Sequence, residues 1–408
     1  MDLTGNSQKI LNGLQVLDLS RGGNGVARQD LGGEPPTQRV VFIPLSMPGD
    51  VVSVRVVKEE KRFATAEIVK IETPAGGRLS PPCSVFGVCG GCTWQHVPYA
   101  LQWKTKRDGI IQALSRTGVI PRGENPPPMR EFQAEKHYGY RNRIQLRARM
   151  LPDGSEATLG YFARGSKTLV DVPRCEIARE ELNGLLPEIR KESTERLKKK
   201  NSVGEKDPEL KIELEVMPDG TTRKSWNART GVLGFRQVND DQNENLLAFV
   251  RENLSKGAHL LDLFGGAGNF SLGDADRYVQ VDCVDVGSPE GGSPDQPSNY
   301  KFYPADVAKW LGRRQSEKMS GSFRPRAPLE AILDPPREGF GDAAARIVTS
   351  LDALGVGRII AIGCDADSWA KDVAKLVQAG WKITQLAAFD LFPQTPHVEA
   401  VAVLERAD

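Results

Sequence analysis

Past residue 240 the sequence alternates between apolar runs of strand length and stretches with a helical pattern, and this alternation constrains the fold more than any other feature. The six runs are HLLDLF, YVQVDCVDV, EAILD, RIIAIG, WKITQLAAFD and VEAVAVLE. Strands of a parallel sheet read as continuous apolar runs because helices cover both faces of the sheet. The pattern therefore predicts an α/β fold with a mostly parallel sheet.

The first run continues into a glycine-rich turn, LLDLFGGAGNF at residues 260–270. Glycines let the backbone of such a turn pass close to a ligand. Asp285 ends the next run, where an acid can hold ribose hydroxyls, and Asp334 of ILDPPREG ends a third. Three polar strand ends around one crevice predict a methyltransferase that binds S-adenosylmethionine. The alternative is a doubly wound domain for another nucleotide.

The first 75 residues have a different pattern. LQVLDL, RVVFIP, DVVSVRVV and ATAEIVKI are short runs rich in Val and Ile, separated by turn sequences such as GGNG and MPGD. Short strands at this spacing predict a small β-barrel, a fold that often binds oligonucleotides.

The net charge of +1 hides an asymmetry, because residues 1–230 carry +8 and residues 231–408 carry −7. A basic front half suggests a polyanionic partner such as RNA, although charge also drifts along chains without function. Within it, YRNRIQLRARM alternates basic and apolar residues, which predicts a strand with one packed and one basic face. We expect this face to meet RNA, unless its arginines pair with local acids. Its basic residues are Arg141, Arg143, Arg147 and Arg149, with Lys104, Lys106 and Arg107 as neighbours.

The six cysteines are unevenly placed. Cys83, Cys89 and Cys92 fall within ten residues, whereas Cys175, Cys283 and Cys364 stand alone. Clustered thiols suggest a metal site or catalysis. The spacing Cys-x5-Cys-Gly-Gly-Cys does not match paired Cys-x2-Cys zinc sites well, and three thiolates from one loop with one from elsewhere can surround a metal cluster.

Seven segments together resemble the bacterial 23S rRNA uracil-5 methyltransferases that carry a TRAM domain and an iron-sulfur cluster. The resemblance covers nearly the whole chain. Its segments are CSVFGVCGGCTWQH (83–96), YRNRIQLRAR (140–149), FRQVN (235–239), DLFGGAGNF (262–270), DPPREG (334–339), the strand end at Cys364, and FPQTPHVEAVAVLER (392–406).

This resemblance implies three domains. Residues 1–75 would form the TRAM barrel of OB type, residues 76–230 a central mixed α+β domain for the iron-sulfur cluster and RNA, and residues 231–408 a Rossmann-like class I methyltransferase domain. The implied ligands of a 4Fe-4S cluster are Cys83, Cys89, Cys92 and Cys175, with zinc as the alternative metal. The implied contacts of S-adenosylmethionine are Gln237, Phe264, Asn269, Asp285, Asp306 and Asp334.

Cys364 ends an apolar strand, where α/β sheets place their sites, although a single cysteine is commonly just a small core residue. Carbon 5 of uracil is too electron-poor to take a methyl group unaided. A thiolate that adds to carbon 6 makes carbon 5 nucleophilic, and a base must afterwards remove its proton. The resemblance assigns Cys364 as this nucleophile and Glu399 as the base. A Glu on such a strand would otherwise be a surface charge.

The chain departs from the family pattern in three places. Gly363-Cys364-Asp365-Ala366 stands where Ser-Cys-Asn-Pro is usual, and Arg236 replaces a usual aromatic residue. Residues 286–298 are rich in Gly, Pro and Ser, which predicts a loop in place of the helix expected after Asp285.

Two other functions stay open at this point. The first is a non-catalytic RNA-binding protein that keeps the fold, and the second is an amino-group methyltransferase that uses Asp-Pro-Pro. The sequence begins without the apolar core of a signal peptide and has no apolar run long enough to span a membrane, so we expect a cytoplasmic protein without a membrane partner. We further expect a monomer whose substrate is an unpaired or loop uridine, because the base must leave its stack to reach the nucleophile.

Overall fold

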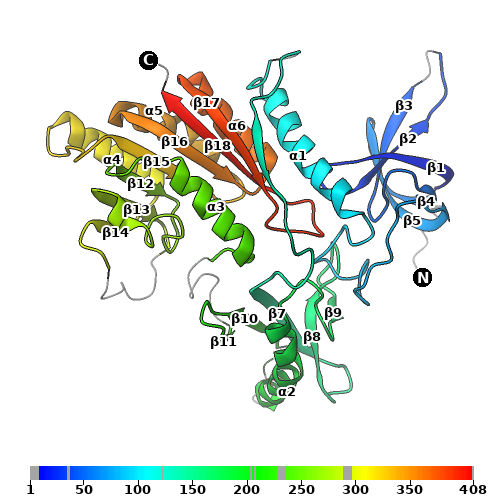
Figure 1. Cartoon of the computed structure of the whole chain (residues 1–408). Coiled ribbons are helices and arrows are strands. Elements are labelled where there is room, and N and C mark those ends of the chain that lie inside the picture. Colours follow the sequence, from blue (N-terminus) through cyan, green and yellow to red (C-terminus); the bar gives the residue numbers. More distant parts are fainter. Residues whose placement is uncertain are drawn as a thin grey trace. The chain divides into compact units, whose positions relative to one another are not determined.

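The computed structural model describes residues 9–34, 37–121, 123–202, 205, 208–227, 236–287 and 296–406. The chain divides into two compact units, and one of the points of division, between residues 106 and 107, falls within helix α1 (Tyr99–Arg116), which Figure 1 labels. The first unit comprises residues 1–106, 137–227 and 392–396, and the second comprises residues 107–136, 228–391 and 397–408. This division does not follow the chain order of the three expected domains, whose boundaries at residues 75 and 230 stay a prediction.

The first unit begins with a closed five-stranded barrel in the order β1-β2-β3-β5-β4. Alternate side chains of its strands point inward, and Val41, Val52, Val54 and Ala64 are wholly buried there. The predicted barrel is confirmed, with one strand more than the apolar runs indicated. Its strands are β1 (Ile10–Leu19), β2 (Gly25–Asp30), β3 (Gln38–Ile43), β4 (Val51–Glu59) and β5 (Phe63–Thr73).

The same unit holds a five-stranded antiparallel sheet in the order β11-β10-β7-β8-β9, with helix α2 packed on one face. Ile144, Leu146 and Ala148 of β7 face this helix, as their spacing predicted. The elements are β7 (Arg143–Met150), β8 (Ala157–Phe162), β9 (Leu169–Asp171), α2 (Glu180–Ser202), β10 (Leu210–Val216) and β11 (Thr222–Trp226).

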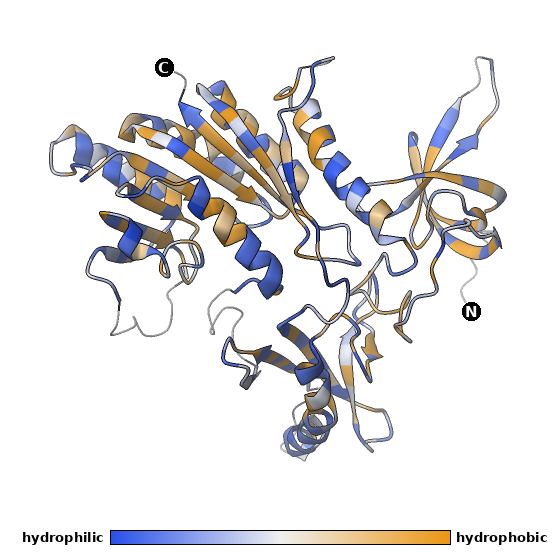
Figure 2. Cartoon of the chain, viewed as in Figure 1, coloured by the Kyte–Doolittle hydropathy of each residue, from blue (hydrophilic) through white to orange (hydrophobic). Residues whose placement is uncertain are grey.

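The second unit is built on an eight-stranded sheet in the order β14-β13-β12-β15-β16-β18-β17-β6. The first five strands are parallel, and β18 runs antiparallel to both of its neighbours. The central strands are buried on both faces and read as hydrophobic in Figure 2, as the predicted α/β fold requires. The strands are β6 (Met129–Phe132), β12 (His259–Leu263), β13 (Gln280–Asp285), β14 (Tyr300–Pro304), β15 (Leu329–Leu333), β16 (Val356–Gly363), β17 (Trp381–Phe389) and β18 (Glu399–Arg406).

Helices connect most of these strands. Helix α3 precedes β12, α4 lies between β14 and β15, α5 between β15 and β16, and α6 between β16 and β17. The helices are α1 (Tyr99–Arg116), α3 (Asp240–Glu252), α4 (Val307–Met319), α5 (Ala344–Leu354) and α6 (Ala366–Gln378), with short 3-10 turns at Ala275–Arg277 and Gly341–Ala343.

One prediction from the sequence needs correction, and a second falls mostly on residues that the structure does not describe. The Pro-rich stretch 121–130 reads as a linker, but its end enters β6, which pairs with β17 through Met129–Leu386 and Phe132–Phe389. The stacking of Phe132 on Phe389, with ring centroids 4.3 Å apart, anchors this edge strand. Most of the loop expected over 286–298 lies outside the described residues. None of the described helices is long and apolar enough to cross a membrane.

Candidate active site

The site lies at the carboxyl edge of the second unit's sheet, where the strand order reverses. The chain fills the sheet from β12 outward through β13 and β14, and then crosses to β15 on the other side of β12. Ligands of open α/β sheets bind in the crevice beyond the strand ends at such a reversal. The glycine-rich turn follows β12, Asp285 ends β13, Asp334 follows β15, and Cys364 follows β16.

The glycine-rich turn is tight enough to exclude side chains at two positions. A Cβ on Gly265 would lie 2.6 Å from the Cys283 sulfur and within 2.9 Å of the Asp262 carboxylate. Gly268 has φ +82°, and a Cβ there would lie 2.5 Å from the Tyr300 hydroxyl oxygen. Between them and the strand, Phe264 adopts φ +63°, a left-handed conformation uncommon for an aromatic residue. Strain of this kind collects where a loop must hold a defined shape for a ligand.

Asp285 is held against this turn. Its carboxylate accepts hydrogen bonds from the backbone N–H of Gly266 at 3.1 Å and of Gly287 at 2.7 Å. Behind the turn, buried Asp262 accepts a hydrogen bond from the Ser271 hydroxyl, and burial raises the pKa of Asp262 to about 6. Two backbone donors thus fix the Asp285 carboxylate at the end of β13, beside the glycine-rich turn.

The remaining expected cofactor contacts stand around the same edge. Asn269 exchanges side-chain hydrogen bonds of 3.1 Å with Asn243 of α3, and Gln237 is buried just before that helix. Phe264 lies parallel to Phe340, with ring centroids 6.3 Å apart. Asp306 is exposed at the end of β14, where its carboxylate caps α4 by accepting from the Lys309 N–H at 2.9 Å.

Cys364 and Glu399 meet because β18 is antiparallel. The register pairs Gly363 at the end of β16 with Ala400 of β18, so the first residue of β18, Glu399, lies at the edge where Cys364 follows β16. Cys364 is partly exposed, whereas Glu399 is only 2% exposed. A partly accessible thiol beside a buried carboxyl is an arrangement that supports nucleophilic addition followed by proton removal.

Burial and neighbouring negative charges raise the pKa values of the acidic groups at this edge. Burial raises the pKa of the Cys364 thiol to about 12, helped by the negative charges of Glu399 and Asp334 and opposed by Arg337. Burial, with the charges of Asp262 and Asp285, raises the pKa of Asp334 to about 7. Burial and the charge of Asp334 raise the pKa of Glu399 well above its usual range. The free site therefore holds a neutral thiol, which must lose its proton before it can react.

Sequence reasoning missed Arg337, which lies inside the DPPREG motif. Its guanidinium contacts His397 Nδ1 at 3.0 Å and lies 4.0 Å from the carboxylate of Asp365. The signal in the sequence was its position in the same motif as Asp334. Arg337 is the basic group whose charge lowers the pKa of Cys364.

The departure from Ser-Cys-Asn-Pro has a structural explanation. Asp365 caps α6 by accepting from the backbone N–H groups of Asp367 and Ser368 at 3.1 Å, a role in which Asp and Asn are equivalent. A Cβ on Gly363 would lie 2.8 Å from Cβ of Trp369, whose indole donates to the Ala361 carbonyl at 3.0 Å. Trp369 therefore occupies the space that a serine side chain would need.

Four cysteines gather in the first unit and form what we call the cysteine cluster: Cys83, Cys89, Cys92 and Cys175. Burial is the main cause that raises the pKa of the first three, to about 12 for Cys92, and the negative charge of Cys175 adds to each. The N–H of Gly91 points to the Cys89 sulfur at 3.4 Å. Among the described residues, however, no three His, Cys, Asp or Glu side chains stand close enough to hold one metal ion.

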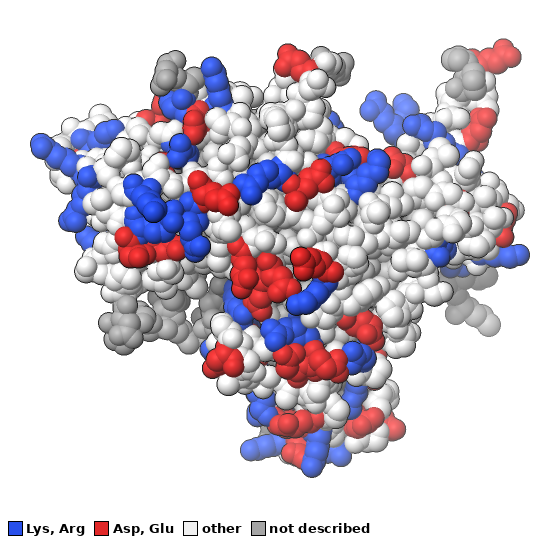
Figure 3. All heavy atoms as spheres, in the orientation of Figure 1, with Lys and Arg blue, Asp and Glu red and all other residues white. Residues whose placement is uncertain are grey.

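The predicted basic RNA-binding face of β7 is wrong in one respect, because its arginines are not free cations. Arg143 pairs with Glu213 and Glu215 of β10, while Arg147 and Arg149 pair with Glu209. In the register of β10 against β7, Glu215 lies opposite Arg143 and Glu213 lies opposite Gln145. Around α2 and β8 to β11, Figure 3 accordingly shows acidic and basic side chains intermixed.

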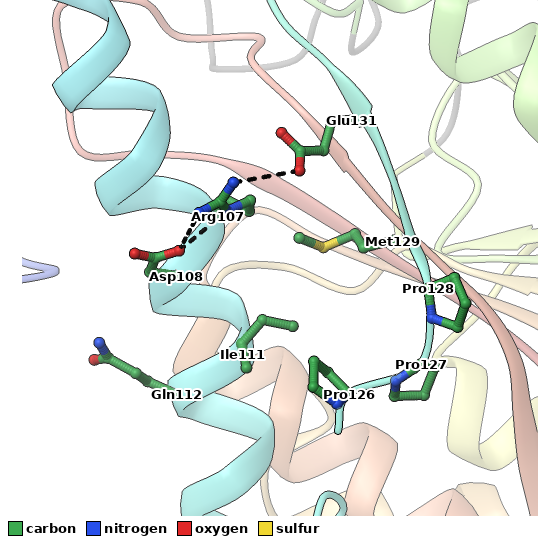
Figure 4. Close-up of a pocket in the computed structure, with 9 residues that line it drawn as sticks. All are labelled: Arg107, Asp108, Ile111, Gln112, Pro126, Pro127, Pro128, Met129 and Glu131. Carbon is green, nitrogen blue, oxygen red and sulfur yellow. Dashed lines mark hydrogen bonds and ion pairs between the residues drawn. The ribbon is translucent and has the colours of Figure 1, made fainter. Parts of the chain in front are cut away.

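Two of the basic residues expected beside that face, Arg107 and Lys106, also have interaction partners. Arg107 bonds Asp108 at 2.8 Å and lies 3.6 Å from Glu131, and Lys106 is buried and donates to the Phe392 carbonyl at 3.0 Å. Arg107 lines a shallow pocket of about 540 Å³ between α1 and the Pro126–Met129 segment (Figure 4). None of the predicted catalytic or cofactor residues lines this pocket.

Comparison with known proteins bears on both units. Residues 14–69 match the TRAM domain family, and residues 326–407 match the tRNA (uracil-5-)-methyltransferase family. The second match covers Asp334, Cys364 and Glu399, which the structure brings to one edge of the sheet.

Relatives extend the similarity along the chain. A 23S rRNA (uracil(1939)-C(5))-methyltransferase, RlmD, of Acinetobacter baylyi is 27% identical over 96% of this chain and 95% of its own length. An uncharacterized RNA methyltransferase of Bdellovibrio bacteriovorus is 29% identical, over 96% and 94%. The crystal structure of Pyrococcus abyssi tRNA (uracil-54, C5)-methyltransferase with S-adenosyl-L-homocysteine matches with TM-score 0.63 and 22% identity, covering 96% of this chain and 99% of that one. This last likeness confirms the predicted class I methyltransferase fold.

Proposed function

We propose that this protein transfers a methyl group from S-adenosylmethionine to carbon 5 of a uridine in RNA, and that 23S rRNA is its substrate. The observation that carries the proposal is the meeting of Cys364 and Glu399 at one strand edge, beside the glycine-rich turn. Neither an RNA-binding protein without activity nor an amino-group methyltransferase needs a thiol and a buried carboxyl there. The similarity to the RlmD of A. baylyi over nearly the full length supports the choice of RNA.

The residues around the glycine-rich turn suit S-adenosylmethionine. Asp285 offers a carboxylate to ribose hydroxyls, and the turn is kept free of side chains at Gly265 and Gly268. Phe264, Asn269, Gln237 and Asp334 border the same edge, and we assign them as cofactor contacts, with Asp306 at its outer end. When bound, S-adenosylmethionine supplies a methyl group on a positively charged sulfur.

The reaction begins with the thiol of Cys364. Because the pKa of this thiol is about 12, its proton must pass to a base, and ionised Asp334, with a pKa of about 7, is the carboxylate suited to accept it near neutral pH. The thiolate then forms a bond to carbon 6 of the uracil, and the electron pair of the carbon 5–carbon 6 double bond moves into an enolate. Arg337 favours the thiolate by its charge.

Carbon 5 of the enolate takes the methyl group while the bond between that group and the sulfur of S-adenosylmethionine breaks, which leaves S-adenosylhomocysteine. Carbon 5 now carries both a methyl group and a hydrogen. In its ionised form Glu399 removes this hydrogen as a proton, the double bond re-forms, and the bond between carbon 6 and the Cys364 sulfur breaks. Burial raises the pKa of Glu399, so less of it is ionised at a given pH, but the ionised carboxylate is a stronger base than an exposed one.

We further propose that the cysteine cluster holds a 4Fe-4S cluster. Three of its thiols come from one loop and the fourth from a distant part of the chain, and the other three are near enough to Cys92 for their charges to act on it. Such a set of thiolates can surround an iron-sulfur cluster. In the chemistry above no step involves this group, and we assign it a structural role.

The experiment that tests the function is methylation of 23S rRNA transcripts by the purified protein, followed by mass mapping of the modified nucleotide. The account predicts 5-methyluridine at an unpaired or loop position and no product with Cys364→Ala. The same uridine placed in a full duplex should react much more slowly, because flipping it out costs a few kcal/mol. A methyl group on an exocyclic amine, or no methyl group on any RNA, would contradict the proposal.

A further inference from the structure

Helix α6, which follows Cys364, carries a buried carboxylate. Asp372 is only 7% exposed, whereas the other buried residues of this helix are apolar. Taking an acidic side chain out of water costs free energy, so an apolar residue would pack more favourably at this position. What an apolar residue could not do here is accept a hydrogen bond.

The hydrogen bond comes from the loop of the DPPREG motif. The backbone N–H of Phe340 donates to the Asp372 Oδ2 at 2.9 Å. The same oxygen lies against Gly339, which has φ +71° and where a Cβ would lie 2.4 Å from it. Any other residue at position 339 would be strained by its backbone and would collide with the carboxylate. Asp372 thus explains the last glycine of DPPREG.

Phe340 connects this contact to the glycine-rich turn. Its ring is buried and lies nearly parallel to that of Phe264, with centroids 6.3 Å apart and an angle of 11° between the planes. Phe264 is the half-buried residue of the turn that adopts φ +63°. Because the Phe340 backbone is fixed by Asp372, its ring limits where the Phe264 side chain can lie.

Ser368, one turn earlier on α6, contacts the same loop. The shortest contact of its hydroxyl is a hydrogen bond donated to the Arg337 carbonyl at 2.7 Å. The Arg337 guanidinium lies 4.0 Å from the carboxylate of Asp365, the residue after Cys364. Residues four apart share one face of a helix, so α6 holds the loop at two points, residues 337 and 340. All of these residues belong to the second unit.

We propose that Asp372 and Ser368 are positioning residues for methyl transfer, Asp372 by holding Phe340 against the cofactor turn and Ser368 by holding Arg337 beside the Cys364 thiol. Neither side chain touches the reacting atoms in this account. The two contacts act on different steps, because Phe264 belongs to the cofactor site and Arg337 acts on the nucleophile. The proposal rests on the function proposed above.

The test of Asp372 is the affinity of the full chain for S-adenosyl-L-homocysteine, measured by calorimetry without RNA. Asp372→Ala leaves the buried Phe340 N–H without an acceptor and should weaken binding at least fivefold. Asp372→Asn keeps an acceptor oxygen and should stay within about twofold of the wild type. Lys375→Ala is the matched control, because Lys375 is exposed on the same helix, and should bind as the wild type does.

Phe340→Leu distinguishes a positioning role from a general loss of stability. If Asp372 acts through the Phe340 ring, Phe340→Leu alone weakens binding at least fivefold, and adding Asp372→Ala changes the affinity by less than about twofold. Binding is compared at a temperature at which thermal unfolding shows each variant to be folded. If Asp372→Ala does not fold, Phe340→Leu decides, and wild-type affinity in that variant overturns the proposal.

The test of Ser368 is the reactivity of the Cys364 thiol. Ser368→Ala should slow alkylation of Cys364, located by peptide mass, about threefold at a given pH, because the thiol pKa rises when Arg337 is held less firmly. It should lower the kcat of uridine methylation and leave the affinity for S-adenosyl-L-homocysteine unchanged. Ser368→Thr keeps the hydroxyl and should restore both rates.

Three results would overturn the proposal. They are wild-type cofactor affinity in Asp372→Ala, equal losses in Asp372→Ala and Asp372→Asn, and unchanged alkylation of Cys364 in Ser368→Ala. A wild-type chain that binds S-adenosyl-L-homocysteine but forms no 5-methyluridine would refute the proposed function instead. The binding and alkylation measurements need no RNA, so they would still decide the roles of Asp372 and Ser368.

Discussion

Glu399 and Cys364 share one edge of the sheet because β18 runs against β16, with Ala400 of β18 paired to Gly363 of β16. A parallel β18 would place Glu399 at the opposite edge of the sheet, about a strand length from the thiol. The antiparallel strand is therefore what brings together two residues that are 35 positions apart in the sequence.

Asp334 should make stability depend on pH. Its pKa is raised from 3.8 to about 7, so the folded chain binds a proton that the unfolded chain has already lost between these values. Its stabilising contribution is complete below about pH 4 and is lost as the pH rises through 7. Relative to the wild type, Asp334→Asn should gain on the order of 2 kcal/mol in unfolding free energy between pH 4.5 and 8, after allowance for partial exposure.

Urea unfolding at several pH values measures this difference. Asp342→Asn is the control, because Asp342 is exposed on the same stretch of chain. Parallel pH profiles for the wild type and Asp334→Asn would show that Asp334 is not protonated in the folded state.

Gly268 should be sensitive to a single methyl group. Gly268→Ala forces a left-handed conformation on alanine and places its Cβ 2.5 Å from the Tyr300 hydroxyl, so we expect at least tenfold weaker binding of S-adenosyl-L-homocysteine by calorimetry. Gly273→Ala is the control, since a Cβ there would meet nothing within 4 Å. Equal affinities in the two variants would remove the turn from the cofactor site.

Gly363→Ser restores the residue that is usual in the family but should destabilise this chain. The new side chain would overlap Trp369, and overpacking of this kind costs about 1–3 kcal/mol. Gly357→Ser on the same strand meets only the Leu329 carbonyl, at 4.0 Å, and should cost less. Thermal unfolding compares the two variants, and equal unfolding temperatures for Gly363→Ser and Gly357→Ser would argue against the clash.

Arg143 should contribute to stability rather than to RNA binding. Its side chain is 12% exposed and pairs with Glu213 and Glu215, which are 9% and 4% exposed, so Arg143→Gln removes a positive charge from beside two buried carboxylates. We expect a loss of about 3 kcal/mol, against less than about 1 kcal/mol for Arg147→Gln at a more exposed pair. A stable Arg143→Gln with a flatter salt dependence of RNA binding would restore the reading of β7 as an RNA-binding face.

The sequence predicted the α/β sheet, the barrel and the packed face of β7, because apolar periodicity records which residues are buried. It did not predict the pairing of Arg143 with Glu213, since that contact joins residues 70 positions apart and depends on the register of β7 against β10. Strand β6 was missed because its four residues have no apolar period of their own and are held by the stacking of Phe132 on Phe389.

The candidate site, too, was only partly predictable from the sequence. The strand ends at Asp285, Asp334 and Cys364 were visible because each follows an apolar run. The role of Arg337 was not, because its effect on the Cys364 thiol arises only when the DPPREG loop folds beside the end of β16. Likewise, Trp369 explains Gly363 only through a contact that no local pattern records.

The order of bond formation at Cys364 and Glu399 is tested most directly by trapping the covalent adduct with labelled RNA and S-adenosylmethionine on a denaturing gel. Glu399→Gln keeps the nucleophile but lacks the base, so the methylated RNA should remain bonded to sulfur and give a slow-migrating band. Cys364→Ala should give no band and no methyl transfer. The absence of an adduct in both variants, with equal residual methylation, would contradict the account.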